Sequence, residues 1–297
     1  PDSAAGELRA KLAGKLGVEA AQVFVGNGGD DVLSVLARTF LNEGEEVIVP
    51  APTFSPYAHV SRIMGARVVT SPLREFRIDL EDIRARLTGR TKLIFLCSPN
   101  NPTGGIVPGR ELVPFLEGLP PRAMVLLDEA YGDFVDDPEF PDAVALAGRF
   151  PLIVLRSFSK IYGLAGLRIG YGVGSGELIG YMDRVREPFN VNLLAQAAAA
   201  AALDDEGFRR RAIEAVREGR RSLYAAFKRL ELAYVESQAN FVFVRVGDGD
   251  AVFEALMRRG VIVRPGSVFG CPEWIRVTVG LPGEEERFLQ ELRRVLA

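Results

Sequence analysis

A lysine at the end of an apolar run has the setting in this sequence that best suits covalent chemistry. The run PLIVLRS at 151–157 leads into Phe-Ser-Lys, and Arg168 follows Lys160 by eight residues. The remaining lysines lie in charged helical patterns or at the start of a strand-like run: Lys11, Lys15, Lys92 and Lys228. Apolar surroundings or a nearby cation lower the pKa of a lysine and leave its amine free to attack a carbonyl. We therefore expect Lys160 to be a nucleophile; the alternative is an exposed loop lysine.

A glycine-rich turn precedes a helical pattern near the N-terminus. The stretch GNGGDD at 26–31 follows the run VFV, and free N–H groups at a helix start attract anions such as phosphate. The stretch is neither a Walker A loop nor a dinucleotide fingerprint, because Asp31 stands where a third glycine is needed. We expect Gly29 and Asp30 to hold an anion; the alternative is a plain turn in which Asp30 caps the helix.

Two further apolar runs end in polar residues. SPNNPTG at 98–104 is a stiff loop with two X-Pro bonds, in which a cis proline and a buried Asn101 would be expected. Asp128 ends the run AMVLLD, where an unpaired carboxylate is costly, and Tyr131 follows shortly after it. For Asp128 seen alone, a salt bridge to a structural arginine is the favoured interpretation.

One cofactor would use all of these groups. Pyridoxal 5′-phosphate carries an aldehyde, a phosphate, a phenolic oxygen and a ring nitrogen. Lys160 would bond to the aldehyde, Asp128 would keep the ring nitrogen protonated, and Asn101 and Tyr131 would contact the phenolic oxygen. Phe54, in APTFSPY, would stack on the ring. The phosphate would be shared by Gly29, Asp30, Ser157, Ser159 and Arg168.

The elements that must position these residues alternate between strand and helix. Strand patterns cover 21–25, 45–50, 66–70, 92–97, 123–128, 151–157 and 167–173, with helical patterns such as 30–41, 79–87 and 109–119 between them. This alternation predicts an α/β fold with a mainly parallel sheet of seven strands flanked by helices. Ligands bind such sheets beyond the carboxyl ends of the strands, where the candidate residues lie.

The pattern changes after about residue 190. Residues 193–230 predict a long, nearly unbroken helical region, followed by strands at 240–246, 261–265 and 274–280 and helices at 249–259 and from about 283. We expect a large cofactor-binding domain over 21–200. A smaller α+β domain would comprise 201–297 together with 1–20, whose helix would pack on it.

Composition excludes several classes of protein. The net charge of −3 gives no reason to expect nucleic acid or a membrane surface as a partner. Cys97 and Cys271 are too few for a disulfide framework, and the single histidine, His59, argues against a histidine-rich metal site or a Ser-His-Asp hydrolase. No metal is expected, and the cytoplasm is the expected location.

The ordered motifs resemble those of fold-type I pyridoxal-phosphate aminotransferases over nearly the whole chain. Within that group SPNNPTG, DEAY, SFSK, AGLRIGY and GVIVRPGSVFG with IRVTVG are similar to the histidinol-phosphate aminotransferases. The resemblance implies transamination in a homodimer on phosphorylated amino-acid and oxo-acid substrates. It also implies that Arg276 and Arg264 bind the substrate's anionic groups; the alternative for both is a surface arginine. In the resembling family an N-terminal arm carries a tyrosine to the neighbouring subunit, and that motif is not in this sequence.

Three rival functions share this fold. A phosphothreonine decarboxylase would have the same scaffold and phosphate-binding arginines. A broad aromatic aminotransferase is less well matched, since many of those carry an apolar residue at the position of Arg264. A transcription regulator built on the fold would carry a DNA-binding domain ahead of it, which this sequence does not contain.

Overall fold

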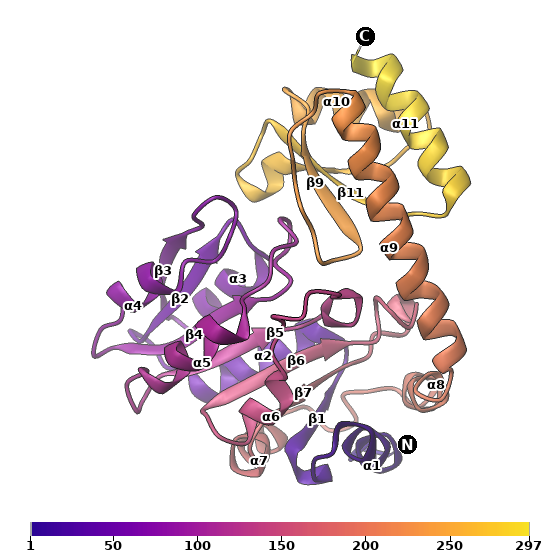
Figure 1. The fold of residues 1–297 in the computed structure, drawn as a ribbon. Helices are drawn as coiled ribbons and strands as arrows, with labels where there is room; N and C mark the ends of the chain where they lie inside the picture. Colours follow the sequence, from indigo (N-terminus) through magenta and orange to yellow (C-terminus); the bar gives the residue numbers. More distant parts are fainter. Residues whose placement is uncertain (1, 297) are drawn as a thin grey trace.

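The structure, a computed structural model, describes residues 2–296 and contains two β-sheets (Figure 1). The larger sheet has seven strands in the order β1-β7-β6-β5-β4-β2-β3. Its strands are β1 (Val23–Gly26), β2 (Glu46–Ala51), β3 (Arg67–Pro72), β4 (Thr91–Cys97), β5 (Met124–Asp128), β6 (Leu152–Ser157) and β7 (Gly170–Val173). Each lies on a run that the sequence predicted to be a strand.

The sheet is mainly parallel. Neighbouring strands from β3 through β2, β4 and β5 to β6 pair in parallel, whereas β7 pairs antiparallel with both β6 and β1. The carboxyl ends of β4, β5 and β6 therefore meet at one edge. The predicted α/β architecture is confirmed.

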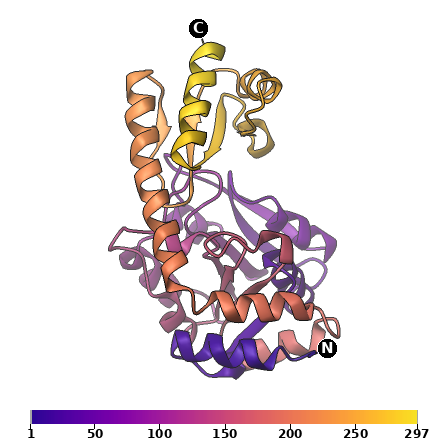
Figure 2. The same cartoon turned by 90° about the vertical axis from the view of Figure 1, so that its right-hand side faces the viewer.

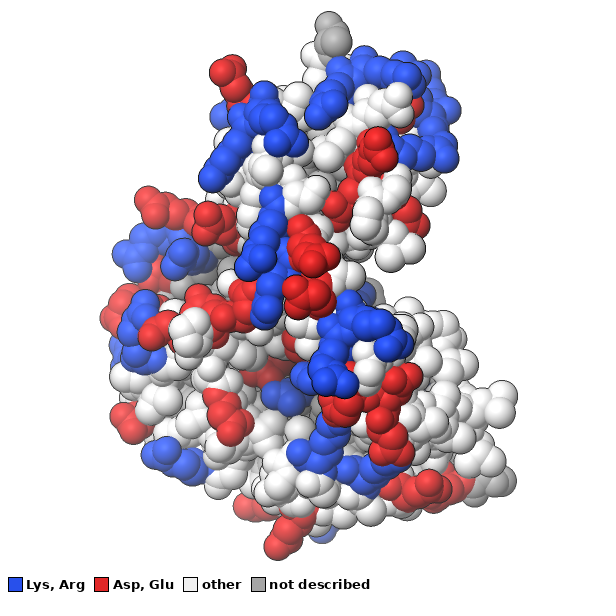
Figure 3. All heavy atoms as spheres, turned by 45° about the vertical axis from the view of Figure 1, so that its right-hand side comes forward, with Lys and Arg blue, Asp and Glu red and all other residues white. Residues whose placement is uncertain are grey.

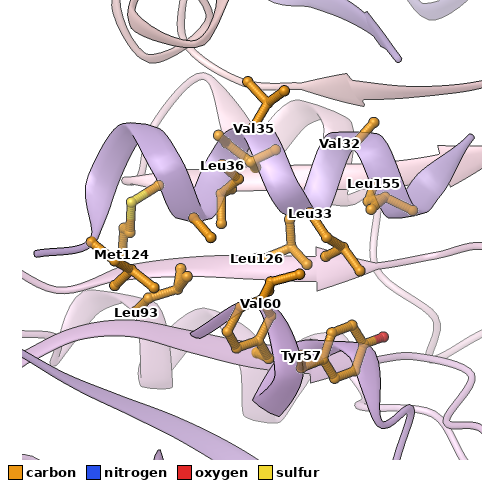
Figure 4. Close-up of a cluster of buried hydrophobic side chains, with 14 of the residues drawn as sticks. Val32, Leu33, Val35, Leu36, Tyr57, Val60, Leu93, Met124, Leu126 and Leu155 are labelled. Carbon is orange, nitrogen blue, oxygen red and sulfur yellow. The ribbon is translucent and has the colours of Figure 1, made fainter. Parts of the chain in front are cut away.

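Alternate residues of the central strands pack against opposite layers of helices. Leu93 and Leu126 face a cluster with α2 (Gly29–Phe40), α3 (Pro56–Ile63) and α7 (Gly176–Val185), as Figure 4 shows for α2 and α3. Ile94 and Leu127 face the other cluster, with α4 (Leu80–Ala85), α5 (Gly109–Glu117) and α6 (Ala143–Ala147). Strands buried on both faces explain the continuous apolar runs in the sequence.

The second sheet has four antiparallel strands in the order β10-β11-β9-β8. These are β8 (Tyr234–Val235), β9 (Phe241–Arg245), β10 (Arg264–Pro265) and β11 (Trp274–Thr278). One face packs in a separate apolar cluster with α9 (Glu206–Arg229), α10 (Gly249–Arg258) and α11 (Pro282–Leu296). The predicted strand at 261–265 shrinks to its last two residues. Short 3₁₀ turns occur at Ala20–Gln22, Gly132–Phe134, Ala165–Leu167 and Gly266–Phe269.

The helical region predicted at 193–230 is confirmed, and one short break divides it into two helices. α8 (Leu193–Ala202) ends before the Asp204-Asp205 pair, and α9 begins at Glu206. The side chain of Asp205 accepts a hydrogen bond from the Phe208 N–H and caps the new helix. α9 then runs from the level of the larger sheet to the second sheet (Figure 1).

The first helix also packs elsewhere than predicted. α1 (Gly6–Leu16) buries Leu8 and Leu12 in a cluster with Val23 and Val25 of β1 and with α8, beside which it lies in Figure 2. Residues 1–20 therefore pack on the side of the larger sheet, because the apolar face of α1 matches that of β1 and α8. The boundary of the large domain at about residue 200 stays a prediction. Within residues 2–296 no helix has both the length and the apolar character needed to cross a membrane.

Candidate active site

A cavity of about 190 Å³ lies at the carboxyl-end edge of the larger sheet. It is lined by Leu33, Cys97, Ala130, Leu155 and Ala165, and by each residue that the sequence assigned to the cofactor: Gly29, Asp30, Phe54, Asn101, Asp128, Tyr131, Ser157, Ser159, Lys160 and Arg168. The topology explains this meeting, since β4 ends at Cys97, β5 at Asp128 and β6 at Ser157. The N-terminus of α2 closes the same edge.

One part of the cavity is suited to an anion. α2 begins at Gly29, so its first backbone N–H groups lack partners within the helix and carry the positive end of the helix dipole. The Arg168 guanidinium lies beside them, 3.3 Å from Asp30 Oδ2. Gly28, with φ 84°, leaves room for this arginine, because a Cβ atom there would lie 2.6 Å from Arg168 Nη2.

The end of β6 and the turn that follows it add hydroxyl groups to this anion-binding part. The Ser159 N–H donates to Ser157 Oγ at 3.0 Å, which fixes the turn that carries both serines. Arg168 has a left-handed backbone, φ 56°, and donates through Nη1 to the Ala165 carbonyl at 3.0 Å. These contacts hold the loop between Ser157 and Arg168 against the start of α2.

The carboxylate of Asp128 is deeply buried. Asp128 is only 5% exposed, and this burial raises the pKa of its carboxyl. Hydrogen bonds from the Tyr57 hydroxyl and the Ala130 N–H lower that pKa and so act in the opposite direction. The Tyr57 hydroxyl donates to Oδ2 at 2.6 Å and the Ala130 N–H to Oδ1 at 2.9 Å. The two donors stabilise the ionised form that the protonated nitrogen of a bound ring would require.

Sequence reasoning missed Tyr57. It lies in APTFSPY, three residues after Phe54, at the start of α3, and its side chain is fully buried. The ring stacks on Phe95 with centroids 5.0 Å apart, which aims its hydroxyl at Asp128. A buried tyrosine needs a partner for its hydroxyl, and this requirement was the one available signal.

Lys160 lies at the open side of the cavity. Its side chain is exposed, and Nζ is 5.4 Å from the centroid of the Tyr131 ring. Partial desolvation by the surrounding protein lowers the pKa of Lys160, and the positive charge of Arg276 lowers it further. Asp128 acts against this lowering. The net effect is a lowered pKa of the Lys160 amine.

The two predicted substrate arginines lie side by side on the second sheet. Arg276 of β11 is the Cα partner of Arg264 of β10. Nη1 of Arg276 donates to Asn101 Oδ1, and its guanidinium lies 4.9 Å from the centroid of Phe241. Arg276 thus reaches the cavity through Asn101, whereas Arg264 is exposed beside it. Burial lowers the pKa of Arg276 from its usual range.

The arrangement fits pyridoxal 5′-phosphate in its chemistry. The cavity combines an anion-binding helix start, a buried carboxylate with donors that favour its ionised form, an amine with a lowered pKa, and the aromatic ring of Phe54. Cys97 also lines it, and burial raises the pKa of that thiol well above its usual range. Cys97 therefore lines the cavity as an uncharged thiol.

Known proteins share both the sequence and the fold. The family model for aminotransferase class I and II matches residues 1–292. The histidinol-phosphate aminotransferase of Moorella thermoacetica is 48% identical over 300 residues, covering 100% of this chain and 78% of that protein.

Solved structures agree with these relatives. The histidinol-phosphate aminotransferase of Sinorhizobium meliloti, in complex with pyridoxal 5′-phosphate, superposes with a TM-score of 0.94 at 29% identity, covering 100% of this chain and 82% of that one. An L-threonine-O-3-phosphate decarboxylase from Porphyromonas gingivalis superposes with a TM-score of 0.88 at 25% identity, covering 100% and 90% of the two chains. Full-length similarity at this level shows that the chain belongs to the aminotransferase class I and II family.

Proposed function

We propose that this enzyme is a histidinol-phosphate transaminase that uses pyridoxal 5′-phosphate as its cofactor. It would transfer the amino group of histidinol phosphate to 2-oxoglutarate and form imidazole-acetol phosphate and glutamate. The 48% identity with the Moorella thermoacetica enzyme over the whole chain carries this proposal. The paired Arg264 and Arg276 beside the cavity support a substrate with a phosphate group.

Each part of the cofactor has a proposed partner in the cavity. Its phosphate would bind the start of α2 at Gly29 and Asp30, with Ser157, Ser159 and Arg168. The ring nitrogen would face Asp128, the phenolic oxygen Asn101 and Tyr131, and the ring would stack on Phe54. Bound there, the cofactor supplies an electron sink for the charge left when the substrate Cα loses its proton.

Lys160 is the proposed acid–base group as well as the proposed covalent anchor. Because the protein lowers its pKa, the Lys160 amine can take the proton from the substrate Cα. It would then deliver a proton to the C4′ atom of the cofactor. Desolvation is the main cause of that lowering, with Arg276 second. The lowered pKa raises the fraction of the amine that is neutral and able to accept a proton.

Arg276 and Arg264 are the proposed anion-binding residues of the substrate site. A planar guanidinium binds carboxylate and phosphate oxygens in pairs and keeps its charge at every physiological pH. Arg276 is held by Asn101 beside the cavity, so it can bind the carboxylate of glutamate in one half-reaction. The same pair of arginines would bind a phosphate in the other.

The two remaining enzyme functions differ in the bond that breaks. A phosphothreonine decarboxylase, whose fold this chain shares, would release carbon dioxide from the Cα–carboxylate bond. Many broad aromatic aminotransferases carry an apolar residue at the position of Arg264, so the second arginine argues modestly against that function. Histidinol phosphate has no carboxylate, so its turnover with 2-oxoglutarate and no release of carbon dioxide excludes the decarboxylase.

The decisive experiment tests Lys160 in the cofactor-loaded enzyme. Borohydride reduction followed by peptide mass mapping should find a pyridoxyl group on Lys160. Lys160→Ala should lose the visible absorbance of the bound cofactor and turn over orders of magnitude more slowly, because one group supplies both covalent binding and proton transfer. The matched control is Lys92→Ala, which makes the same change at a lysine outside the cavity. Near-normal turnover by Lys160→Ala would refute the assignment.

The assembly is proposed to be a homodimer, as the resemblance to fold-type I aminotransferases implies. Amino-acid and oxo-acid substrates are small molecules. Acidic and basic side chains are interspersed over the face of the molecule that Figure 3 shows. The cytoplasmic location stays a prediction.

A further inference from the structure

A hairpin turn after β3 extends toward the second sheet. Arg74 and Arg77 exchange both of their backbone hydrogen bonds, each 2.9 Å long, and enclose Glu75 and Phe76. The two enclosed residues have φ angles of 51° and 62°. This is the geometry of a type I′ turn, whose central positions usually hold asparagine or glycine. A phenylalanine in this conformation is unfavourable, so other contacts must hold it there.

The contacts that hold Phe76 come from the second sheet. Its ring meets the edge of Trp274 with centroids 4.7 Å apart and an interplanar angle of 62°. It also meets Phe243 at 6.0 Å and 78°. Trp274 in turn stacks on Phe243 at 4.9 Å and 17°. Such edge-to-face and stacked pairs are attractive beyond their burial, so Phe76 joins the two parts of the chain.

The aromatic cluster lies on the same face of the sheet as Arg276. Trp274 and Arg276 are two residues apart on β11, and side chains at that spacing point to one face. Phe243 is the direct Cα partner of Arg276 across the β9–β11 pairing, so its side chain shares that face too. The residues between them, such as Ile275 and Val244, point into the helix-covered core. Phe76 therefore packs against the face of the second sheet that carries Arg276, the proposed substrate-binding arginine.

We propose that Phe76 is a positioning residue for substrate binding in the transamination reaction. Its ring, held by the strained turn, fixes β11 relative to the larger sheet and so keeps the Arg276 guanidinium on Asn101 at the cavity. This inference rests on the proposed function, because it takes Arg276 as the residue that binds the substrate's anionic group. Phe76 is not among the residues that line the cavity, so it would act through Trp274 and Phe243.

Steady-state kinetics of the cofactor-loaded enzyme test the proposal with Phe76→Ala. The KM for histidinol phosphate should rise roughly three- to tenfold, the loss expected for an aromatic pair that orients the binding site. The turnover number and the visible cofactor absorbance should stay within about twofold of the wild type, because Lys160 and Asp128 are untouched. Phe76→Tyr keeps the ring and should restore the KM.

A matched control lies in the same turn. Glu75→Ala replaces an exposed neighbour that has the same left-handed backbone, so it should leave the KM unchanged. Trp274 is the only tryptophan in the sequence, and its fluorescence therefore reports on this contact directly. Emission should move to longer wavelength in Phe76→Ala and stay as in the wild type in Glu75→Ala. If Phe76→Ala does not fold, Phe76→Leu keeps an apolar side chain without the ring and takes its place.

The double variant separates this inference from the proposed function. If Phe76 acts through Arg276, then Phe76→Ala added to Arg276→Ala should raise the KM no further than Arg276→Ala alone. Unchanged KM and unchanged emission in Phe76→Ala, with a raised KM in Arg276→Ala, would overturn the role of Phe76 and leave the proposed function standing. An Arg276→Ala enzyme with a normal KM would instead overturn the substrate role of Arg276.

Discussion

Asp128 has one side-chain hydroxyl among the donors that favour its ionised form. The carboxylate is buried at the end of β5, where desolvation raises its pKa, and Tyr57 is its side-chain donor. The Ala130 N–H supplies the second hydrogen bond. A carboxylate that must stay ionised in such a place needs donors of this kind, since unpaired burial of a charge is costly.

Removing the Tyr57 hydroxyl should therefore move the acid limb of the pH profile. In Tyr57→Phe the pKa of Asp128 rises further, so a higher pH is needed to ionise it. A hydrogen bond to a charged group contributes about 1.5–3 kcal/mol, which corresponds to a shift of roughly one to two pH units in kcat/KM. The measurement is kcat/KM against pH for both proteins. Overlapping acid limbs would contradict the role of Tyr57, and Tyr181→Phe, an exposed tyrosine, is the control.

Arg264 is the residue whose loss should separate phosphorylated from unphosphorylated substrates. It is exposed beside Arg276, where a substrate phosphate can reach both side chains. Arg264→Leu should lower kcat/KM for histidinol phosphate by roughly ten- to a hundredfold and that for histidinol much less, because a charge-assisted hydrogen bond to phosphate is lost. Arg245→Leu, an exposed arginine of the same sheet, is the matched control. Equal losses on both substrates would count against phosphate recognition by Arg264.

At the scale of elements, α9 connects the two sheets. Arg209 on its first turns pairs with Asp133 at 2.9 Å, in the loop that follows the cavity residue Tyr131. Further along, Arg220 donates to the Ser237 carbonyl at 2.8 Å and to Asp136 at 3.0 Å. The arginines of α9 thus bind the loop that leaves the active site and the segment that enters β9.

Arg220 is the part of this connection whose removal should cost most stability. The residue is 4% exposed, so Arg220→Ala leaves the Ser237 carbonyl and the Asp136 carboxylate short of a buried donor. The free energy of unfolding should fall by about 1.5–3 kcal/mol, the range for hydrogen bonds that involve a charged group. Urea unfolding followed by circular dichroism measures this loss. Arg221→Ala, an exposed neighbour on the same helix, should change stability by less than about 0.5 kcal/mol, and a similar loss in both variants would contradict the argument.

At the scale of the whole molecule, loops of the larger sheet meet the second sheet close to the cavity. Gly104 has φ 80°, and a Cβ there would lie 2.1 Å from Ser237 Oγ. The Gln238 N–H donates to the Gly104 carbonyl at 2.8 Å. The SPNNPTG loop therefore contacts the segment between β8 and β9 through its backbone and β11 through Asn101, and only glycine fits beside Ser237.

The proposed homodimer is tested by mass in solution. One chain has a mass of 32.4 kDa, so light scattering of the cofactor-loaded protein should give about twice that value. The mass should not change on dilution through the concentrations used for assay. A mass of one chain together with full transaminase activity would contradict the need for a second subunit.

The succession of strands along the chain and the residues at the strand ends were available from the sequence alone. Continuous apolar runs identified the buried strands, and the carboxyl ends of parallel strands must share an edge, so Asp128, Ser157 and Lys160 were expected together without knowledge of any contact. The resemblance added Arg264 and Arg276. These predictions depend on local residue patterns and on a general rule of sheet topology. Both can be applied to the amino-acid sequence without knowledge of tertiary contacts.

Only the tertiary structure decided the contacts that no pattern encodes. Tyr57 bonds to Asp128 across 71 positions of the chain, Phe76 meets Trp274 from another sheet, and α1 packs beside α8 rather than on the C-terminal part. Each depends on the direction of a side chain or face after distant elements have packed. Periodicity shows which face of an element is buried, but the partner of that face is chosen by the shape and free energy of the whole core.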